Sequence, residues 1–313
     1  MHASLPFFCP IDDLEALALA YAPMATGRPL RFYAHLSPTL QARYSGDGMR
    51  IAQIVDALLG NAFCHTSSGK ITLSAQIEYA DSGKPVLRCR VFDSGDGIDA
   101  KARARIFDSA APARTDGKGR VLANCARDCA TMGGTLTLDS IAGMGSVFTA
   151  TVPLIPFHPF DPPRDTRAAA MPRNTVAFIL CHEPDMEQRL IETLQLRGWS
   201  PRAMASLDAA IHALRTMRPP AFVLVNDDYR RDAAQRLHAA GAVPVIRTAS
   251  EGPRHPAACG EGCLEVTEYS HRALLEAIDI AMKHRATDFS RIDMSPGNSG
   301  VSRSLHNTST PYA

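Results

Sequence analysis

The sequence predicts an α/β protein built from two domains. Three observations lead to this prediction: 45% of the 313 residues are hydrophobic, a proline-rich break interrupts the chain at residues 156–173, and apolar strands alternate with helical segments after that break. We therefore expect a first domain at residues 1–155, a linker at 156–173 and a doubly wound parallel sheet at 174–284. Residues 285–313 are rich in Ser, Asn, Thr, Pro and Gly, which predicts disorder.

Hydrophobic spacing places the elements of the first domain. One helical face is formed by Ile51, Ile54, Val55, Leu58 and Leu59. After this helix ends near Cys64, the pattern predicts two strands, a short helix, a glycine-containing loop, a second helix and a closing hairpin. Their predicted ranges are 71–79 and 86–93 for the strands, 100–107 for the short helix, about 120–132 for the second helix, and 135–140 with 145–154 for the hairpin.

The second domain reads as a regular alternation of strands and helices. Its apolar runs "TVAFILC", "AFVLVN" and "VPVIRT" are typical of strands buried on both faces of a parallel sheet. The remaining elements are predicted as helices at 187–197, 207–217, 232–240 and 271–284 and as strands near 202–204 and at 263–267.

Composition excludes several classes of protein. The formal net charge of +1 gives no electrostatic case for nucleic acid or an anionic membrane. No apolar run approaches the ~20 residues that span a bilayer, and residues 1–10 do not form a signal peptide, so we expect a cytoplasmic protein. Among eight cysteines, Cys125/Cys129 and Cys259/Cys263 are spaced by four, but two such pairs far apart do not make a zinc site, and we expect reduced thiols.

The stretch "VFDSGDGID" at residues 91–99 carries chemistry. It places Asp93, Gly95 and Gly97 directly after a predicted strand. By itself Asp-x-Gly-x-Gly is more often a tight turn. The alternative is a flat ligand lying against side-chain-free backbone, with the carboxylate reading the edge of that ligand.

Four segments, in this order, decide between these readings: "RIAQIVDALLGNAFCHT", "VFDSGDGID", "ARIFD" and "GKGRVLANCARDCATMGGTLTLDSIAGMGSVFTATVPL". They resemble the asparagine box, first glycine box, phenylalanine box, and second glycine box with closing hairpin of the ATP-binding catalytic domain of sensor histidine kinases, especially hybrid ones. The resemblance implies an ATPase α/β sandwich, with a mixed sheet covered by helices on one face. ATP and magnesium would lie between helices and a lid loop.

The resemblance also assigns roles to residues. Asp93 would accept a hydrogen bond from the adenine amino group, Gly95 and Gly97 would admit the ring, and Asn61 would be a magnesium ligand alongside phosphate and water oxygens. Phe107 would anchor the base of the lid. The phosphates would lie against the residues that lead into the second predicted helix, which are Gly117, Lys118, Gly119 and Arg120.

Departures from the family pattern weaken this expectation. Ala57 stands four residues before Asn61, where the family has Asn or Glu, and its methyl group can neither hold magnesium's water nor accept a proton. The neighbouring Asp56 points about 100° away around the helix. Cys64 replaces a frequent basic residue. Val121 takes the place of a third glycine, which is unfavourable if that position requires positive φ.

The second domain resembles the receiver domain of response regulators in its alternation and in the segments "HEPDMEQRL", "PVIRTA" and "GCLEVTEYSHRALLEAI". The positions that carry receiver chemistry differ: Cys181 and His182 replace the magnesium carboxylates, Asn226 replaces the phosphoacceptor aspartate, and Glu268 replaces the lysine. Only Thr248 fits.

Residues next to these positions leave an alternative open. Glu183 keeps an acid past the first strand, and a one-residue slip would present Asp227 or Asp228, although such a slip reverses every side chain of the strand. We expect a pseudo-receiver that serves as a docking surface.

The resemblance implies a two-component signalling protein that binds magnesium-ATP and transfers phosphoryl to a histidine in trans. The chain starts at a segment resembling the one after the family's phosphoacceptor hairpin, and His182-Glu183 follows a strand rather than lying on such a hairpin. The expected partner is thus a histidine-bearing kinase hairpin or a response regulator. The alternative is a non-catalytic protein that docks on a true kinase or regulator, and a truncated gene product without function is a third possibility.

Overall fold

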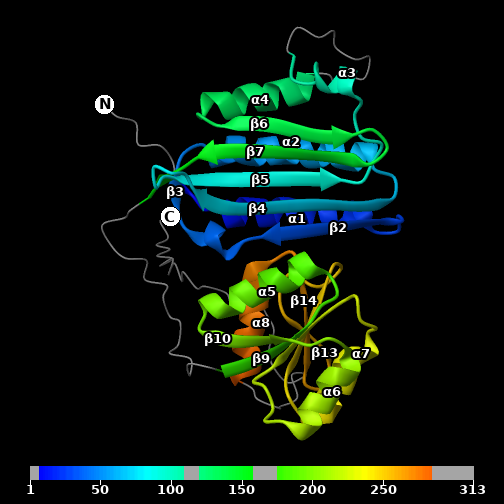
Figure 1. The fold of residues 1–313 in the computed structure, drawn as a ribbon. Helices are drawn as coiled ribbons and strands as arrows, with labels where there is room; N and C mark the ends of the chain where they lie inside the picture. Colours follow the sequence, from blue (N-terminus) through cyan, green and yellow to red (C-terminus); the bar gives the residue numbers. More distant parts are fainter. Residues whose placement is uncertain (1–6, 109–119, 158–174, 284–313) are drawn as a thin grey trace, which may run out of the picture.

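The computed structural model describes residues 7–108, 120–157 and 175–283, which form two α/β units. The first unit covers residues 7–157 and the second covers residues 175–283. In Figure 1 the second unit lies beside β2, the edge strand of the large sheet of the first unit.

The first unit is built on a mixed five-stranded sheet in the order β2-β4-β5-β7-β6. β2 and β4 are parallel, and the other neighbours are antiparallel. Burial alternates along each strand, so one face is apolar and the other polar. The strands are β2 (Leu30–Leu36), β4 (Gly69–Tyr79), β5 (Pro85–Asp93), β6 (Thr135–Ile141) and β7 (Gly145–Pro153).

Helices cover the apolar face of this sheet, as the sequence predicts. α2 (Gly48–His65) buries the predicted apolar stripe against β5, and the Asp47 carboxylate caps its start by accepting a hydrogen bond from Arg50 N at 2.9 Å. α1 (Pro10–Ala25) packs against α2 and β2, and α4 (Val121–Thr131) packs against α2 and β6. α3 spans only Ala100–Arg103, shorter than the predicted 100–107.

A second, three-stranded sheet closes one side of this unit. It consists of β1 (Phe7–Phe8), β3 (Tyr44–Ser45) and β8 (Ile155–Pro156), and the short 3-10 helix η1 (Pro38–Gln41) precedes β3. Phe157 N also donates to Arg43 O at 3.0 Å. The ordered contacts of the first unit therefore reach residue 157, two residues into the predicted linker.

The second unit has the predicted parallel sheet, in the order β10-β9-β11-β12-β14, with β13 added antiparallel at the edge. Strand order 2-1-3-4-5 is that of flavodoxin-like doubly wound folds. The strands are β9 (Thr175–Leu180), β10 (Trp199–Ala203), β11 (Val223–Asn226), β12 (Val245–Ala249), β13 (Ala257–Gly260) and β14 (Cys263–Thr267). The helices are α5 (Pro184–Leu196), α6 (Leu207–Thr216), α7 (Asp232–Gly241) and α8 (His271–Lys283).

One crossover of the second unit differs from the expected alternation. Between β12 and β14 the described chain forms β13 instead of a helix. The segment of β13, "AACG", is short and has no hydrophobic periodicity, so no local pattern predicts this strand.

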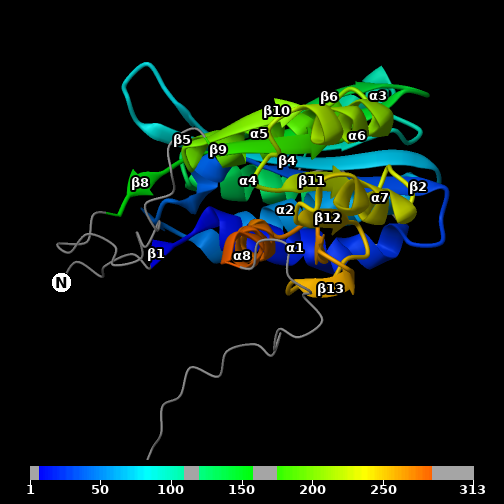
Figure 2. The same cartoon turned by 90° about the horizontal axis from the view of Figure 1, so that it is seen from below.

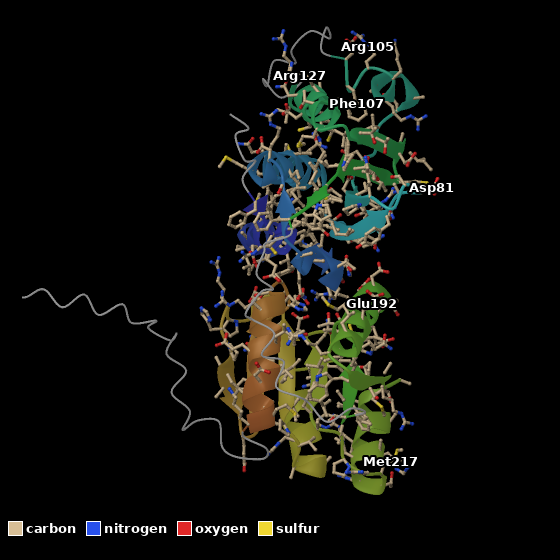
Figure 3. The ribbon with its side chains drawn as sticks, turned by 90° about the vertical axis from the view of Figure 1, so that its left-hand side faces the viewer. Asp81, Arg105, Phe107, Arg127, Glu192 and Met217 are labelled. Atoms are coloured by element: carbon tan, nitrogen blue, oxygen red, sulfur yellow. The ribbon has the colours of Figure 1, made fainter. Side chains whose placement is uncertain are left out.

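The two units share packing. Tyr269, which lies two residues before α8, belongs to the buried core of the first unit, where its ring stacks on Phe32 at 5.5 Å between centroids. In the view from below, α8 of the second unit lies in front of α1 of the first (Figure 2), and the start of α8 meets α1 where Glu15 Oε1 accepts from His271 N at 2.6 Å. Figure 3 shows Phe107 and Arg127 at the end of the first unit farthest from the second, whereas Glu192 of α5 lies near the junction.

Candidate functional site

Asp93 is the last residue of β5, and its side chain is buried with 3% of the residue exposed. Its Oδ1 accepts a hydrogen bond from Gly95 N at 3.0 Å. Burial raises the pKa of the Asp93 carboxyl, while hydrogen bonds from Gly95 and Ser146 oppose that rise. The carboxylate therefore does not face open solvent, which is the minimum that the predicted purine site requires.

Glycine is required at positions 95 and 97 because another part of the protein's own backbone comes too close for a side chain. A Cβ on Gly95 would lie 2.2 Å from the carbonyl oxygen of His65, at the end of α2. A Cβ on Gly97, which has φ of +64°, would lie 2.0 Å from the carbonyl oxygen of Ile141. The loop after Asp93 is thus packed between α2 and the β6–β7 hairpin. Contact of these glycines with a ring stays a prediction.

Two buried hydroxyls fix this loop to the hairpin, and sequence reasoning missed them. Ser140 Oγ accepts from Ile98 N at 2.8 Å and lies 3.1 Å from Ser146 Oγ. Arg103 Nη1 donates to Ser140 O at 2.9 Å, which ties α3 to the same strand. The sequence does contain a signal for these contacts, which is the pair of serines on either side of the turn segment "IAGMG". Hydroxyl side chains are unexpected at the ends of two largely apolar strands.

Asn61 lies in the last turn but one of α2 and is partly buried. Residues four apart share a helical face, so Asn61 is on the face that carries His65, whose carbonyl oxygen approaches Gly95. Ala57 lies one turn earlier and packs against the core. Asp56 Oδ1 accepts from Tyr21 Oη of α1 at 2.9 Å, so its carboxylate is engaged there and does not replace the polar group missing at position 57.

Arg120 directly precedes α4, is exposed, and makes no side-chain hydrogen bond that caps the helix. Gly117, Lys118 and Gly119 lie outside the described residues. Val121 is the first residue of α4, with helical backbone. Positive φ at a residue other than glycine occurs only at Ala242 among the described residues, so the unfavourable backbone predicted for Val121 does not arise.

Phe107 is partly buried against the core of the first unit, at the end farthest from the second unit (Figure 3), and its role in anchoring a lid stays a prediction. It lies four residues beyond the end of α3, so a loop rather than the predicted helix carries it. The end of β5, the end of α2 and the start of α4 belong to elements that the sequence predicted, whereas the loop that carries Phe107 does not.

The equivalent end of the second unit lacks an exposed acid at the predicted phosphoacceptor position. Asn226 is buried, and its Oδ1 accepts from Asp228 N at 2.8 Å. His182 is exposed, lies between β9 and α5 rather than on a helix, and stacks on Tyr229 with ring centroids 4.3 Å apart. Cys181 is buried, and burial raises the pKa of its thiol to about 12, which keeps it protonated.

Three more side chains complete this end of the second unit. Thr248 is buried, and its Oγ1 has no hydrogen-bond partner. Glu268 is 5% exposed, and burial raises the pKa of its carboxyl to about 7. Asp227 Oδ2 accepts from Ser250 N at 2.8 Å and from Ser250 Oγ at 2.7 Å.

The first unit covers the carboxyl ends of these parallel strands. Asp228 Oδ1 pairs with Arg31 Nη1 of β2 at 2.8 Å, and Tyr269 Oη donates to Phe32 O at 2.9 Å. Glu15 of α1 caps α8 across the interface, because its Oε1 accepts from His271 N at 2.6 Å. The end at which a receiver carries out its chemistry is therefore an interface between the two units.

Comparison with known proteins agrees with this geometry. Residues 46–156 match the family described as histidine kinase-, DNA gyrase B-, and HSP90-like ATPase. The first unit contains an ATPase domain of this family. The domain contains Asn61, Asp93, Gly95 and Gly97, which confirms the family expected from the sequence motifs.

Curated relatives extend the comparison. Sensor histidine kinase RcsC of Escherichia coli (strain K12) is 34% identical over 153 residues, which cover 47% of this chain and 16% of that protein. Sensor protein TorS of the same organism is 29% identical over 224 residues, 71% of this chain and 24% of TorS. The chain thus spans a quarter or less of these relatives. It is homologous to hybrid sensor histidine kinases, and this homology supports a role in two-component signalling.

A solved structure resembles more than the ATPase domain. The crystal structure of full-length ShkA in complex with AMPPNP has a TM-score of 0.56 and 23% sequence identity, covering 79% of this chain and 50% of ShkA. Residue 157 is the midpoint of the 313 residues, so this similarity of fold extends into the second unit. No helix among the described residues has the length and hydrophobicity to cross a membrane.

Proposed function

We propose that the ATPase domain binds ATP with its adenine at Asp93. The observation that carries the proposal is the buried carboxylate at the end of β5, held by Gly95 N at 3.0 Å within the segment that matches the ATPase family. Since the second oxygen of a carboxylate can accept a further hydrogen bond, an adenine amino group is a suitable donor for it. Water would be excluded there by the same packing that buries Asp93.

The donor set fits magnesium weakly. Asn61 offers one amide oxygen, and magnesium is commonly bound by one or two protein groups together with phosphate and water oxygens. Ala57 adds no ligand or base one turn away. The phosphates would meet the uncapped start of α4 and the side chain of Arg120, with Gly117, Lys118 and Gly119 as the remaining predicted contacts. When bound, magnesium would neutralise phosphate charge.

Phosphoryl transfer would proceed to a histidine in trans, on a kinase hairpin, and a response regulator would receive the group later in the relay. The role of this chain's residues is to position the nucleotide and stabilise charge, because little covalent chemistry by the protein is needed. With Ala57 unable to accept a proton, the partner's imidazole would attack unaided by a base at that position. The second unit would act in docking, since Asn226 is not a nucleophile of the acyl-phosphate kind.

Isothermal titration of magnesium-ATP into the full chain tests this proposal. Micromolar to submillimolar binding is expected, and Asp93→Asn should weaken it roughly tenfold to a hundredfold, because a hydrogen bond to a buried charged group contributes about 1.5–3 kcal/mol. Asp96→Asn is the matched control, since Asp96 is exposed in the same loop. Absence of binding at millimolar ATP, in a folded protein, would instead support the non-catalytic docking function.

A further inference from the structure

Three potential metal ligands meet at the junction of the two units. His35 lies on β2 of the first unit, Glu183 caps the start of α5, and Asp185 lies in the first turn of α5. One ligand atom from each of these residues lies within 4.8 Å of the other two, and His35 Nε2 is 3.8 Å from Glu183 Oε2. We call these residues the His35 cluster.

The imidazole of His35 is buried without a partner. Its side chain is 10% exposed, and neither Nδ1 nor Nε2 makes a hydrogen bond. A buried polar group left unpaired costs about 1–3 kcal/mol, so two such atoms on one ring indicate a missing partner. A neutral imidazole carries one ring nitrogen with a lone pair that a metal ion can accept.

We propose that the His35 cluster binds a divalent first-row transition metal ion, with zinc as the representative ion, and thereby clamps the two units together. Zinc takes imidazole nitrogen and carboxylate oxygen ligands at about 2.0–2.2 Å, which separates neighbouring ligands by roughly 3.3 Å around a tetrahedral centre. The 3.8 Å between His35 Nε2 and Glu183 Oε2 needs a closure of roughly 0.5 Å, and the pairs with Asp185, which lie within 4.8 Å, need a closure of at most about 1.5 Å. Three protein ligands leave a fourth position for water.

The surroundings select the class of ion. Glu183 Oε2 also accepts from Met186 N at 2.6 Å, an interaction that orients the carboxylate as outer-shell contacts commonly do. Lys70 and Arg189 lie close enough to His35 to lower its pKa, and their positive charges oppose any cation. Two carboxylates offset those charges, but hard ions such as magnesium and calcium prefer all-oxygen ligands. Ions that bind imidazole strongly are therefore favoured.

An opening beside the cluster would let an ion enter. A cavity of about 530 Å³ lies between β4, β5 and α5, and its lining includes His35, Asp185 and Arg189. Glu192, labelled in Figure 3 near the junction, lines the same cavity. Because the ligands come from both units, metal binding would stabilise the docked arrangement over any arrangement in which the units separate.

Zinc titration of the untagged full chain, in competition with a chromophoric chelator, tests the site. We expect one high-affinity site that the double variant Glu183→Gln/Asp185→Asn weakens at least tenfold. This variant removes both charges while glutamine can still accept the hydrogen bond from Met186 N. His35→Ala should weaken binding by a similar factor. His255→Ala is the matched control, because His255 Nδ1 lies 3.7 Å from Glu276 Oε2 on the surface without a third ligand.

Two further readouts separate this site from adventitious binding at other histidines. Visible absorption bands of bound cobalt(II) should be present in the parent chain and in His255→Ala, and lost in Glu183→Gln/Asp185→Asn. Zinc should raise the melting temperature of the parent chain and leave that of the double variant unchanged. Equal zinc affinity of the parent and the double variant would overturn the proposal, whatever the result of the ATP titration.

Discussion

In each unit a central strand ends in a polar residue, but the surroundings of that residue differ between the two units. In the first unit, β5 ends in Asp93, whose carboxylate is buried within the first unit, two strands from the interface strand β2. In the second unit, β11 ends in Asn226, and the equivalent end is covered by β2 and α1. The residues predicted to bind a ligand lie at the end of a strand in the first unit, whereas the strand ends of the second unit are used for contact between the units.

The covered end is what the predicted pseudo-receiver would have, with its parallel sheet kept and its strand ends used for contact. Tyr269, Glu15 and Arg31 make specific contacts where a receiver would need solvent access for phosphoryl transfer. These contacts pair polar groups across the interface and contribute to stability. Substitutions at the covered end should therefore affect the stability of the whole chain rather than any reaction.

The largest effect is expected for Tyr269→Ala. The variant removes an aromatic ring from the core of the first unit together with its hydrogen bond to Phe32 O, and should lower the free energy of unfolding by about 3–5 kcal/mol. Urea denaturation of the full chain measures this change. Tyr79→Ala, at a ring that is 72% exposed, is the control. Equal midpoints for the two variants would mean that the interface contributes little.

An intermediate effect is expected from Glu268. Its pKa of about 7 in the folded protein exceeds the usual 4.5, so between these values the folded chain holds a proton that the unfolded chain has released. Stability therefore falls as pH rises from about 4.5 to about 7. Glu268→Gln removes this loss, which amounts to roughly 3 kcal/mol at most.

Unfolding curves at pH 5 and pH 8 measure the effect of Glu268. The variant should gain stability relative to the parent at pH 8 much more than at pH 5. Glu276→Gln, at a half-exposed carboxyl of α8, serves as the comparison. A parallel pH dependence in the Glu268→Gln variant and the parent would refute the burial of a titrating carboxyl at this end.

The smallest effect is expected for Glu15→Ala, which removes the cap of α8. Loss of a helix cap costs about 0.5–2 kcal/mol, and the freed His271 N–H stays near the interface. Glu15→Gln keeps an acceptor and should cost less. Asp81→Ala, in the turn labelled in Figure 3, controls for loss of a surface carboxylate. Thermal melting of the three variants ranks them, and equal values for Glu15→Ala and Asp81→Ala would rule out the cap.

Local patterns predicted most elements because their periodicity is strong. The stripe of α2, the alternation along β4 and β5 and the apolar runs of β9, β11 and β12 all form where expected. β2 was missed although "LRFYAHL" alternates apolar and polar residues, which is a usable strand signal. β13 was missed because small residues carry no such signal.

The candidate site shows the same difference between features that a local pattern predicts and features that it does not. Asp93, Gly95 and Asn61 could be selected from ordered motifs, which are local in sequence. The Ser140–Ser146 contacts, the His35 cluster and the insertion of Tyr269 join residues that are distant in the chain or lie across strands, and no pattern in one segment encodes them. The conformation of Val121 also required the structure, because a motif gives the residue but not its φ.

The covering of β2 has a practical consequence. β2 is a terminal strand of its sheet, and its outer edge is occupied by a neighbour from the other half of the chain, which binds the Phe32 carbonyl. Separating the two halves would expose backbone groups and aromatic rings along this edge strand. Exposed edge strands promote self-association. The shortest soluble fragment of this protein should therefore contain both halves.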